Sequence, residues 1–545
     1  MERFFRDLLH LHASYQRYGE KEDRFRRLAG QLLSIAAVIF GAYYLSWHFR
    51  FINWSIWYIS VPFFSAEGIG WLLFISFSFV TWYPRRHLPE GIPIDKTFTV
   101  DVFVSTCGEP LNILSRTLMA AVALDYEPKT LYVLDDKANP EVAALAEKFG
   151  IQYLARPEHL DAKAGNLNFG LAHSQGELIL ALDADQVPNR GILRHVLGYF
   201  KIPAIAFVQT KQNFLVPKGD PFGNTDKVFY NVMQCGKDGD NAAFSCGSGV
   251  VYRRRALEEI GGFSTWNVVE DVHTSMLLHQ RGWRSVYYPY PQSIGTAPVD
   301  IWGVYRQRGQ WALDSLRLFF WDNPFFRRGL TFRQMMQYFN LGFVYLVSAW
   351  SMPIFFIVPI MSIFTSQPVM TASVPAYILH RLPYFIIMAL AYAVLNYPTP
   401  YLYAYQMWTG LFPVFMKATV KALLHRRSKP PYSVTSKKQV AELRRPAVLA
   451  LLPQLAIIAG AIATIIYGIF FSTAPLDFRM LNCAWATWSI WTLSGLCQAA
   501  LSKVCWAEES PEPEWFSRRQ VIHNGLAFSF FLFMVLLSAA IIIQK

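Results

Sequence analysis

Residues 178–185 read LILALDAD, an unbroken apolar run that ends in two aspartates. Similar short apolar runs lie at residues 100–106, 131–134, 151–155 and 205–209. Such runs are typical of strands that are buried on both faces of a sheet. Segments with helical periodicity separate them, for example residues 140–150 and 166–176. The series predicts repeated βαβ units, and therefore an α/β domain with a mostly parallel, doubly wound sheet.

Polar side chains follow three of these predicted strands at the point where each strand ends. They are residues 105–109 (STCGE), the pair Asp135 and Asp136, and the pair Asp183 and Asp185. Ligands of open α/β sheets bind beyond the carboxyl ends of the strands, and carboxylates gathered there need a cation or hydrogen-bond donors. A divalent metal carried in with a diphosphate would supply that cation, with Asp183 and Asp185 as oxygen ligands for Mg²⁺ or Mn²⁺. A solvated turn is the alternative.

Three segments further along offer groups that a ligand could use. Lys163 opens a helix, where a cation could meet diphosphate oxygens, although the same residues could form a capping turn. Residues 244–248 (FSCGS) are a turn of small residues suited to close approach of a ligand. Asp271 is a candidate general base, with a helix N-cap as the alternative. Residues 307–311 (QRGQW) lie on a helix expected to run toward a membrane, where Trp311 could instead be an interfacial anchor.

The composition places this α/β segment inside a membrane protein. Of 545 residues, 53% are hydrophobic and 16% charged, whereas soluble domains carry about 25% charged residues. An all-soluble enzyme and a disordered chain are therefore excluded. We expect about seven spans, near residues 29–51, 57–82, 341–364, 376–396, 447–471, 480–503 and 521–543. Residues 401–424 are interrupted by Pro413, Lys417 and Lys421, which favours a helix along the interface over an eighth span.

Arginine and lysine residues gather in alternate loops between these spans. The positive-inside rule therefore puts the N-terminus, residues 84–330 and residues 398–446 in the cytoplasm. These arginine and lysine residues beside the spans account for the net charge of +12, so we expect no nucleic-acid partner. The expected division is residues 1–83 (an N-terminal segment and two spans), residues 84–330 (the cytoplasmic domain) and residues 331–545 (interface helices and the remaining spans). The six cysteines lack metal-binding spacing and are expected to be free thiols.

Taken in order, several short motifs carry a resemblance: STCGEP, LDD, KAGNLN, LDAD, FSCGS, VED and QRGQW. With spans on both sides, they resemble the processive family-2 glycosyltransferases, which include the cellulose, curdlan, chitin and hyaluronan synthases. The resemblance covers residues 90–330 closely. Residues 432–437 (YSVTSK) are similar to the F-x-V-T-x-K gating loop of bacterial cellulose synthases, with a flexible basic linker as the alternative. The resemblance implies a GT-A-type domain inserted in a transmembrane helical bundle.

The resemblance also implies a role for each motif residue. Asp271 would be the catalytic base with Glu270 beside it, and Asp185 and Asp183 would hold the metal, Mg²⁺ or Mn²⁺. The donor would be bound by Thr106, Glu109, Asp135, Lys163, Asp183, Gln307, Arg308 and Trp311. The acceptor would contact Cys246, Gly247, Ser248 and Trp311. The gating loop, within residues 430–438, would use Tyr432, Val434, Thr435 and Lys437.

One motif departs from the family pattern. The pattern is Q-x-x-R-W, and the arginine position is Gln310 in this chain. The lost charge would weaken diphosphate binding unless Arg308 or a neighbouring arginine takes its place. No cyclic-di-GMP-binding barrel follows the last expected span, so we do not expect regulation by that nucleotide through this chain.

These implications predict an inverting, processive enzyme of the plasma (inner) membrane. It would polymerise UDP-glucose into a β-glucan, with β-1,3, β-1,4 or mixed linkages, and pass the growing polysaccharide across the lipid bilayer. Accessory secretion subunits and oligomeric state stay open. The alternatives are a chitin- or hyaluronan-type synthase that uses UDP-GlcNAc, a non-processive transferase acting on a lipid carrier, and a transporter or receptor with an inactive nucleotide-binding domain.

Overall fold

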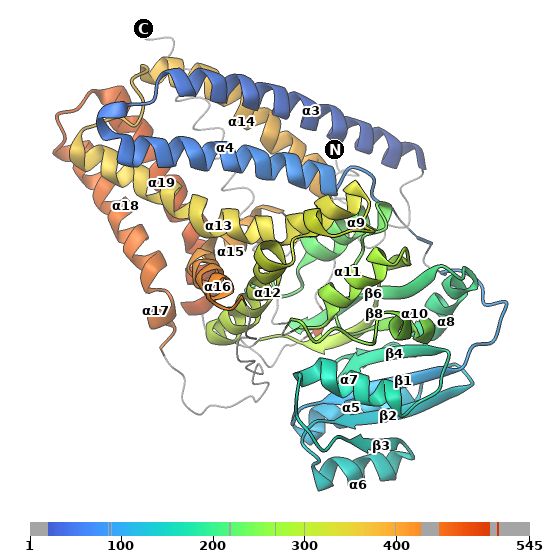
Figure 1. Ribbon diagram of the computed structural model, residues 1–545. Helices are drawn as coiled ribbons and strands as arrows, with labels where there is room; N and C mark the ends of the chain where they lie inside the picture. The colour runs from blue at the N-terminus through green and yellow to red at the C-terminus, as the bar shows by residue number, and fades with distance from the viewer. Residues whose placement is uncertain are drawn as a thin grey trace, which may run out of the picture.

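The computed structural model describes residues 20–501, except residues 86, 89, 217–219, 268, 299, 398, 400 and 427–445, together with residues 510–511. The expected span at 521–543 lies outside the described residues, as do the gating-loop candidates Tyr432, Val434, Thr435 and Lys437. Figure 1 shows the α/β part at one end of the molecule and a bundle of long helices at the other.

A nine-stranded sheet organises the α/β part, in the order β3-β2-β1-β4-β7-β6-β8-β5, with β9 paired to β6. The strands are β1 (Val100–Thr106), β2 (Lys129–Asp135), β3 (Gln152–Ala155), β4 (Leu178–Asp183), β5 (Val187–Pro188), β6 (Ile205–Val216), β7 (Val250–Arg253), β8 (Arg284–Thr296) and β9 (Ser510–Pro511). Strands β1 to β4 pair in parallel, as do β6 and β8, whereas β7 is antiparallel to β4 and β6. The predicted, mostly parallel sheet is confirmed; the antiparallel β7 is not among the predicted strands.

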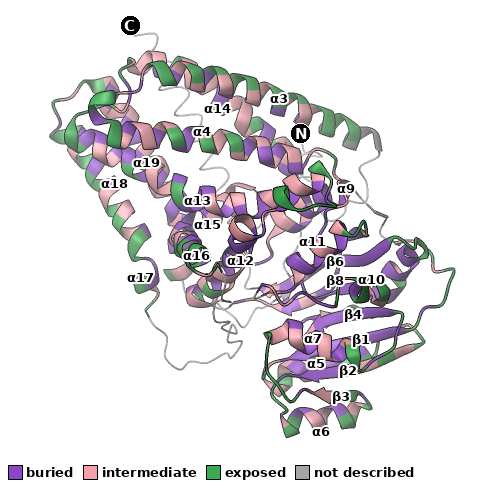
Figure 2. Cartoon of the chain, in the orientation of Figure 1, coloured by how far each residue is buried: buried purple, intermediate pink, exposed green. Residues whose placement is uncertain are grey.

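The strands are buried on both faces, as their apolar runs predict. Val102 of β1 packs in one core cluster and its neighbour Phe103 in another, because successive side chains of a strand point to opposite faces. The first cluster includes residues of α5 (Leu111–Val122), α6 (Pro140–Phe149) and α8 (Ile192–Val196). The second includes residues of α7 (Ala162–Ala172), α10 (Arg254–Glu259) and α11 (Asp271–Gln280). Figure 2 shows the strands buried between these helices.

Five helices among the described residues are long and apolar enough to cross a membrane. They are α3 (Glu20–Arg50), α4 (Trp57–Val80), α13 (Phe332–Thr365), α14 (Val374–Asn396) and α18 (Leu452–Phe470). The expected span at 480–503 forms the less apolar α19 (Leu476–Leu501), which packs along α18. Residues 401–424 form two helices, α15 (Tyr401–Gly410) and α16 (Phe412–Leu424). Neither is long enough alone to cross a hydrocarbon core of about 30 Å, in line with the expected interface segment.

Helix α9 (Gln234–Gly239) joins the sheet to the membrane helices. Gly236 packs against the carbonyl group of Val80, at the end of α4, and Gly239 packs against that of Tyr83. Between the two glycines, the buried Lys237 donates a hydrogen bond to the carbonyl oxygen of Gln337 in α13, at 2.6 Å. Burial lowers the pKa of Lys237 to about 7. The backbone of α9 therefore lies in direct contact with the chain leaving α4.

We expect Gly236→Ala to destabilise the protein, because the added Cβ would overlap the Val80 carbonyl oxygen, which is backbone and cannot swing aside. The usual cost of such overpacking is about 1–3 kcal/mol. Thermal unfolding in detergent measures it. The matched control is Gly68→Ala, whose Cβ would meet nothing within 4 Å and whose midpoint should hold or rise slightly. Equal midpoints for the two variants would contradict the close packing.

Candidate active site

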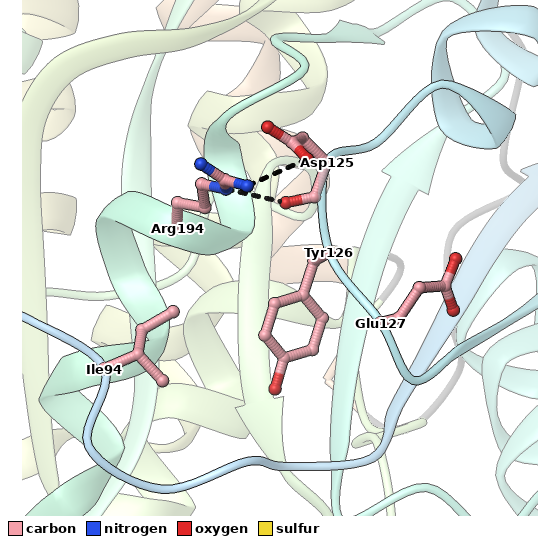
Figure 3. Close-up of a pocket in the computed structure, with 5 residues that line it drawn as sticks. All are labelled: Ile94, Asp125, Tyr126, Glu127 and Arg194. Atoms are coloured by element: carbon pink, nitrogen blue, oxygen red, sulfur yellow. Dashed lines mark hydrogen bonds and ion pairs between the residues drawn. The ribbon is translucent and has the colours of Figure 1, made fainter.

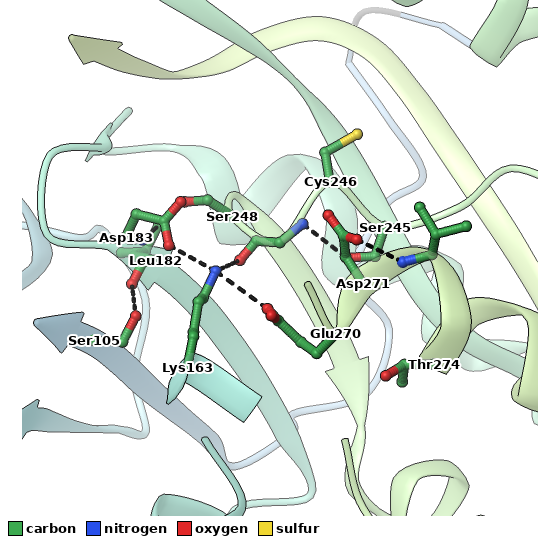
Figure 4. Close-up of polar contacts among 12 residues, drawn as sticks. Ser105, Lys163, Leu182, Asp183, Ser245, Cys246, Ser248, Glu270, Asp271 and Thr274 are labelled. Atoms are coloured by element: carbon green, nitrogen blue, oxygen red, sulfur yellow. Dashed lines mark hydrogen bonds and ion pairs between the residues drawn. The ribbon is translucent and has the colours of Figure 1, made fainter. Parts of the chain in front are cut away.

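The ammonium group of Lys163 connects three segments at the carboxyl edge of the sheet (Figure 4). Its Nζ lies 2.6 Å from Asp183 Oδ1 at the end of β4 and 3.3 Å from Glu270 Oε1, directly before α11. It also donates to the carbonyl oxygen of Gly247 at 2.6 Å. Burial lowers the pKa of Lys163, but the charges of Asp183 and Glu270 outweigh this and raise it overall. The structure thus brings together residues from four of the sequence motifs.

Gly247 allows this close approach. Its φ is +78°, and a Cβ at this position would lie 3.0 Å from Lys163 Nζ and 3.5 Å from Asp271 Oδ2. Hydrogen bonds on either side hold the turn: Ser245 Oγ accepts from the Gly247 N–H at 3.1 Å, and Ser248 Oγ accepts from the Asp183 N–H at 2.9 Å. A small-residue turn beside the charged groups is what the FSCGS segment predicts. The neighbouring Cys246 thiol accepts from Gln234 Nε2 at 3.4 Å, so its sulfur faces α9.

Asp271 is the first residue of α11 and one residue beyond Glu270. Its Oδ1 accepts a hydrogen bond from the Val272 N–H at 2.6 Å. Burial, together with the negative charge of Glu270, raises the pKa of Asp271 well above its usual value, although Lys163 acts in the opposite direction. Asp271 is half-buried. A carboxylate with a raised pKa beside other polar groups in a partly enclosed site is typical of a general base.

The chain has well-defined relatives. Residues 178–404 match the family described as "Glycosyl transferase family group 2". The chain is 31% identical over 485 residues to "Cellulose synthase 1 catalytic subunit [UDP-forming]" of Komagataeibacter xylinus, covering 84% of this chain and 64% of that protein. It is 34% identical over 339 residues to the cellulose synthase catalytic subunit of Pseudomonas fluorescens, covering 58% of this chain and 46% of that protein.

Residues 178–404 therefore form a family-2 glycosyltransferase domain. This match, together with the observed sheet, confirms the predicted GT-A-type fold of the α/β part. The chain spans less than two thirds of the length of either cellulose synthase. A solved mannosyltransferase, PcManGT from Pyrobaculum calidifontis in complex with GDP-Man and Mn²⁺, is 19% identical and covers 67% of this chain and 98% of its own, with a TM-score of 0.49.

In this glycosyltransferase, the predicted donor-binding residues near the ends of β1 and β2 are already hydrogen-bonded to protein groups. Thr106 Oγ1 donates to Glu109 Oε2 at 2.8 Å. Asp135 is fully buried and accepts from the N–H groups of Lys137 and Asn139, at 2.9 and 2.7 Å, and from the Tyr153 hydroxyl at 2.9 Å. Thr106 and Asp135 are register partners in β1 and β2. These side chains therefore shape the edge of the sheet on which a nucleotide base would lie.

The two aspartates of the DAD motif differ in their surroundings. The Asp183 side chain is 37% exposed and contacts Lys163, whereas Asp185 is 5% exposed and its Oδ2 accepts from Thr296 Oγ1 at 2.6 Å. Within the described part of the chain, no group of three or more His, Cys, Asp or Glu side chains could hold a metal. Mg²⁺ usually uses one or two carboxylates together with substrate phosphates. The donor set fits a metal that arrives with the substrate.

The QRGQW motif lies on α12 (Ile301–Trp321), with Gln307 and Trp311 one turn apart and both half-buried. Arg308 is one of the predicted donor-binding residues and a candidate to take the place of the missing arginine of the motif. Its guanidinium donates to Asp226 Oδ2 at 2.6 Å and lies 4.8 Å from the centre of the Trp311 ring. Gln310 donates to Asp314 Oδ2 at 2.9 Å. Arg308 is therefore engaged by a carboxylate that the sequence analysis did not consider.

An open pocket of about 470 Å³ lies elsewhere on this domain (Figure 3). It is lined by Ile94, Asp125, Tyr126, Glu127 and Arg194, and Arg194 Nη2 lies 3.0 Å from Asp125 Oδ1. Residues 125–127 directly precede β2, so the pocket is at the amino-terminal edge of the sheet. It contains none of the predicted site residues and is separate from the Lys163 cluster.

Proposed function

We propose that this chain is an inverting, processive glycosyltransferase that polymerises UDP-glucose into a β-glucan. The observation that carries the proposal is the convergence of Lys163, Asp183, Gly247 and Glu270 beside the half-buried Asp271. The named relatives are UDP-forming cellulose synthases, which favours UDP-glucose as the donor. Residues 84–330 would form the cytoplasmic catalytic domain of an inner-membrane protein, between α4 and α13.

Each residue of the site has its own role in the proposed reaction. Lys163 meets the diphosphate of the donor, where its charge favours the departing phosphate oxygens. Asp271 accepts the proton of the acceptor hydroxyl as the new glycosidic bond forms. Asp183 and Asp185 would hold a divalent metal, Mg²⁺ or Mn²⁺, which would neutralise charge on the leaving nucleoside diphosphate. Attack from the side opposite the leaving group converts an α-linked donor into a β-linked product.

The path of the product follows from the position of α12. The helix carries Gln307 and Trp311 and packs against α13 and α16, so an acceptor sugar on Trp311 would lie where the catalytic domain meets the membrane helices. A polysaccharide is too polar to cross hydrocarbon unaided, and the helical bundle would supply its route.

The test supplies the purified full chain in detergent with Mg²⁺ or Mn²⁺ and one radiolabelled UDP-sugar at a time. We expect UDP release and a water-insoluble product from UDP-glucose that a linkage-specific β-glucanase digests. A product made only from UDP-GlcNAc would identify UDP-GlcNAc as the donor, as in a chitin- or hyaluronan-type synthase. A small product extractable into organic solvent would identify a transferase acting on a lipid carrier. Absence of UDP release with every donor would refute the proposal.

The pH dependence should report the environment of Asp271. The base must be ionised, so turnover should fall as the pH drops through the raised pKa of Asp271, at a higher pH than for an exposed carboxylate. In Glu270→Gln, one of the charges that raises this pKa is gone, and the acid limb of kcat should move to lower pH. The matched control, Glu258→Gln, changes a side chain that is 57% exposed and should leave the limb in place. An unmoved limb in Glu270→Gln would contradict the assignment of Asp271.

Gln310→Arg restores the cation that the family motif carries at this position. We expect the KM for the UDP-sugar to fall about two- to tenfold, the range of one typical net hydrogen bond of about 0.5–1.5 kcal/mol. Steady-state UDP release measures it. The matched control is Gln175→Arg, which adds the same charge at an exposed position before β4. An unchanged KM would mean that the new arginine pairs with Asp314 and does not reach the diphosphate.

A further inference from the structure

Asn267 connects the segment before the catalytic carboxylates to α12 at two points. It lies three residues before Glu270 and is 4% exposed. Its Nδ2 donates to the carbonyl oxygen of Asp314 at 3.0 Å, and its Oδ1 accepts from Arg317 Nη1 at 2.8 Å. Both Asp314 and Arg317 belong to α12, the helix that carries Gln307 and Trp311.

Arg317 is itself buried, at 2% exposure, and contacts two segments outside α12. Besides Asn267, its guanidinium carbon lies 4.9 Å from the centre of the Trp266 ring. Its Nε donates to the carbonyl oxygen of His425, at the end of α16, at 3.3 Å. The planar guanidinium carries several donors in a fixed arrangement, so one arginine can hold several partners at once.

A second contact ties the same segment to the end of α12. Trp266 stacks on His273, with ring centres 4.8 Å apart, and His273 lies two residues beyond Asp271 in α11. His273 Nε2 is 2.7 Å from Asp322 Oδ2, directly after the last residue of α12. The first turn of α11, which carries Asp271, is therefore connected to α12 on both its amino- and carboxyl-terminal sides.

We propose that Arg317 is a positioning residue which, through Asn267 and Trp266, fixes the distance between the Asp271 carboxylate and the acceptor-binding face of α12. The inference rests on the proposed function. A general base must lie within hydrogen-bond reach of the hydroxyl it deprotonates, and an acceptor on Trp311 is positioned by α12. A displacement of about 1 Å between base and acceptor can cost about 100-fold in rate, without any change at Lys163 or Asp183.

The experiment compares Arg317→Gln with Arg306→Gln in the full-length protein. Arg306 is an exposed arginine of the same helix, so the control removes the same charge. In Arg317→Gln we expect kcat to fall about 10- to 100-fold. The dissociation constant of UDP should stay within about twofold, because Lys163 lies on a different element. Arg306→Gln should keep both values.

A double-mutant cycle tests whether Arg317 acts through Asn267. The kcat of the variant with both Arg317→Gln and Asn267→Ala should be close to that of the worse single variant, since the two side chains act as one unit. Should Arg317→Gln fail to fold, Asn267→Ala alone provides the test. It removes the oxygen that accepts from Arg317 Nη1, so kcat should fall while UDP still binds.

Three results would overturn the inference. The first is a normal kcat in Arg317→Gln or, where that variant does not fold, in Asn267→Ala. The second is a loss of UDP affinity parallel to the loss of kcat, and the third is that the effects of the two single substitutions on kcat simply multiply. A wild-type protein that binds UDP but releases none from any UDP-sugar would instead refute the proposed function, and the inference with it.

Discussion

Asp271→Asn is expected to lower the rate of sugar transfer by about 10²–10⁴-fold, the usual contribution of a general base. The amide keeps the size of the carboxylate and can still accept the hydrogen bond from the Val272 N–H, so α11 should form normally. Because the donor contacts lie on Lys163 and the strand ends, UDP affinity should stay within about twofold. Single-turnover rates with UDP-glucose, together with calorimetric titration with UDP, measure the two effects separately.

The matched control is Asp125→Asn, the same chemical change at the opposite edge of the sheet, where the side chain is 41% exposed. It should turn over like the wild type. Near-normal transfer by a well-folded Asp271→Asn protein would remove Asp271 from the role of base and leave Glu270 as the carboxylate to examine.

Lys163→Met is expected to weaken donor binding by about 10- to 100-fold, since a hydrogen bond to a charged group is worth about 1.5–3 kcal/mol. Methionine keeps much of the apolar stem and removes the ammonium group. Asp183 and Glu270 would then face each other without the cation that now lies between them. Calorimetric titration with UDP in the presence of Mg²⁺ measures the effect on the diphosphate side of the site.

The control, Lys148→Met, removes an exposed lysine at the end of α6 and should bind UDP normally. Wild-type UDP affinity in Lys163→Met would show that the lysine only neutralises the carboxylates. In that case the thermal midpoint would fall while the donor site stayed intact.

The sequence predicts much of the sheet because its central strands are continuous apolar runs. The runs at 100–106 and 178–182 coincide with β1 and β4 to within one residue. Strand β8 escapes prediction because Pro289 and Pro291 interrupt it, and prolines normally exclude a segment from the interior of a sheet. The structure accommodates them by shifts of register between β6 and β8 near Lys211 and Pro291. Strand β7 escapes because it is four residues long and no helix separates it from the preceding turn.

The candidate site is predictable where a motif lies at a strand end or a helix start, as for Asp183, Lys163 and Asp271. Contacts between segments far apart in the sequence are not. Asp226 and Arg308 are 82 residues apart, and Asp185 and Thr296 are 111 apart. No local pattern marks such pairs, so the engagement of Arg308 and the hydrogen bond to Asp185 emerge only from the fold. Asn267 belongs to the same class.

The contact between α9 and the ends of α4 and α13 bears on how this enzyme can be prepared. A water-soluble fragment of residues 84–330 would lack Val80, Tyr83 and Gln337, and would leave Lys237 without the carbonyl oxygen that now accepts its hydrogen bond. The turn at Ser245 begins six residues after α9 ends. A lipid composition or detergent that loosens α4 and α13 would therefore disturb the turn at residues 245–248. The catalytic rate should then depend on the bilayer in which the protein is reconstituted.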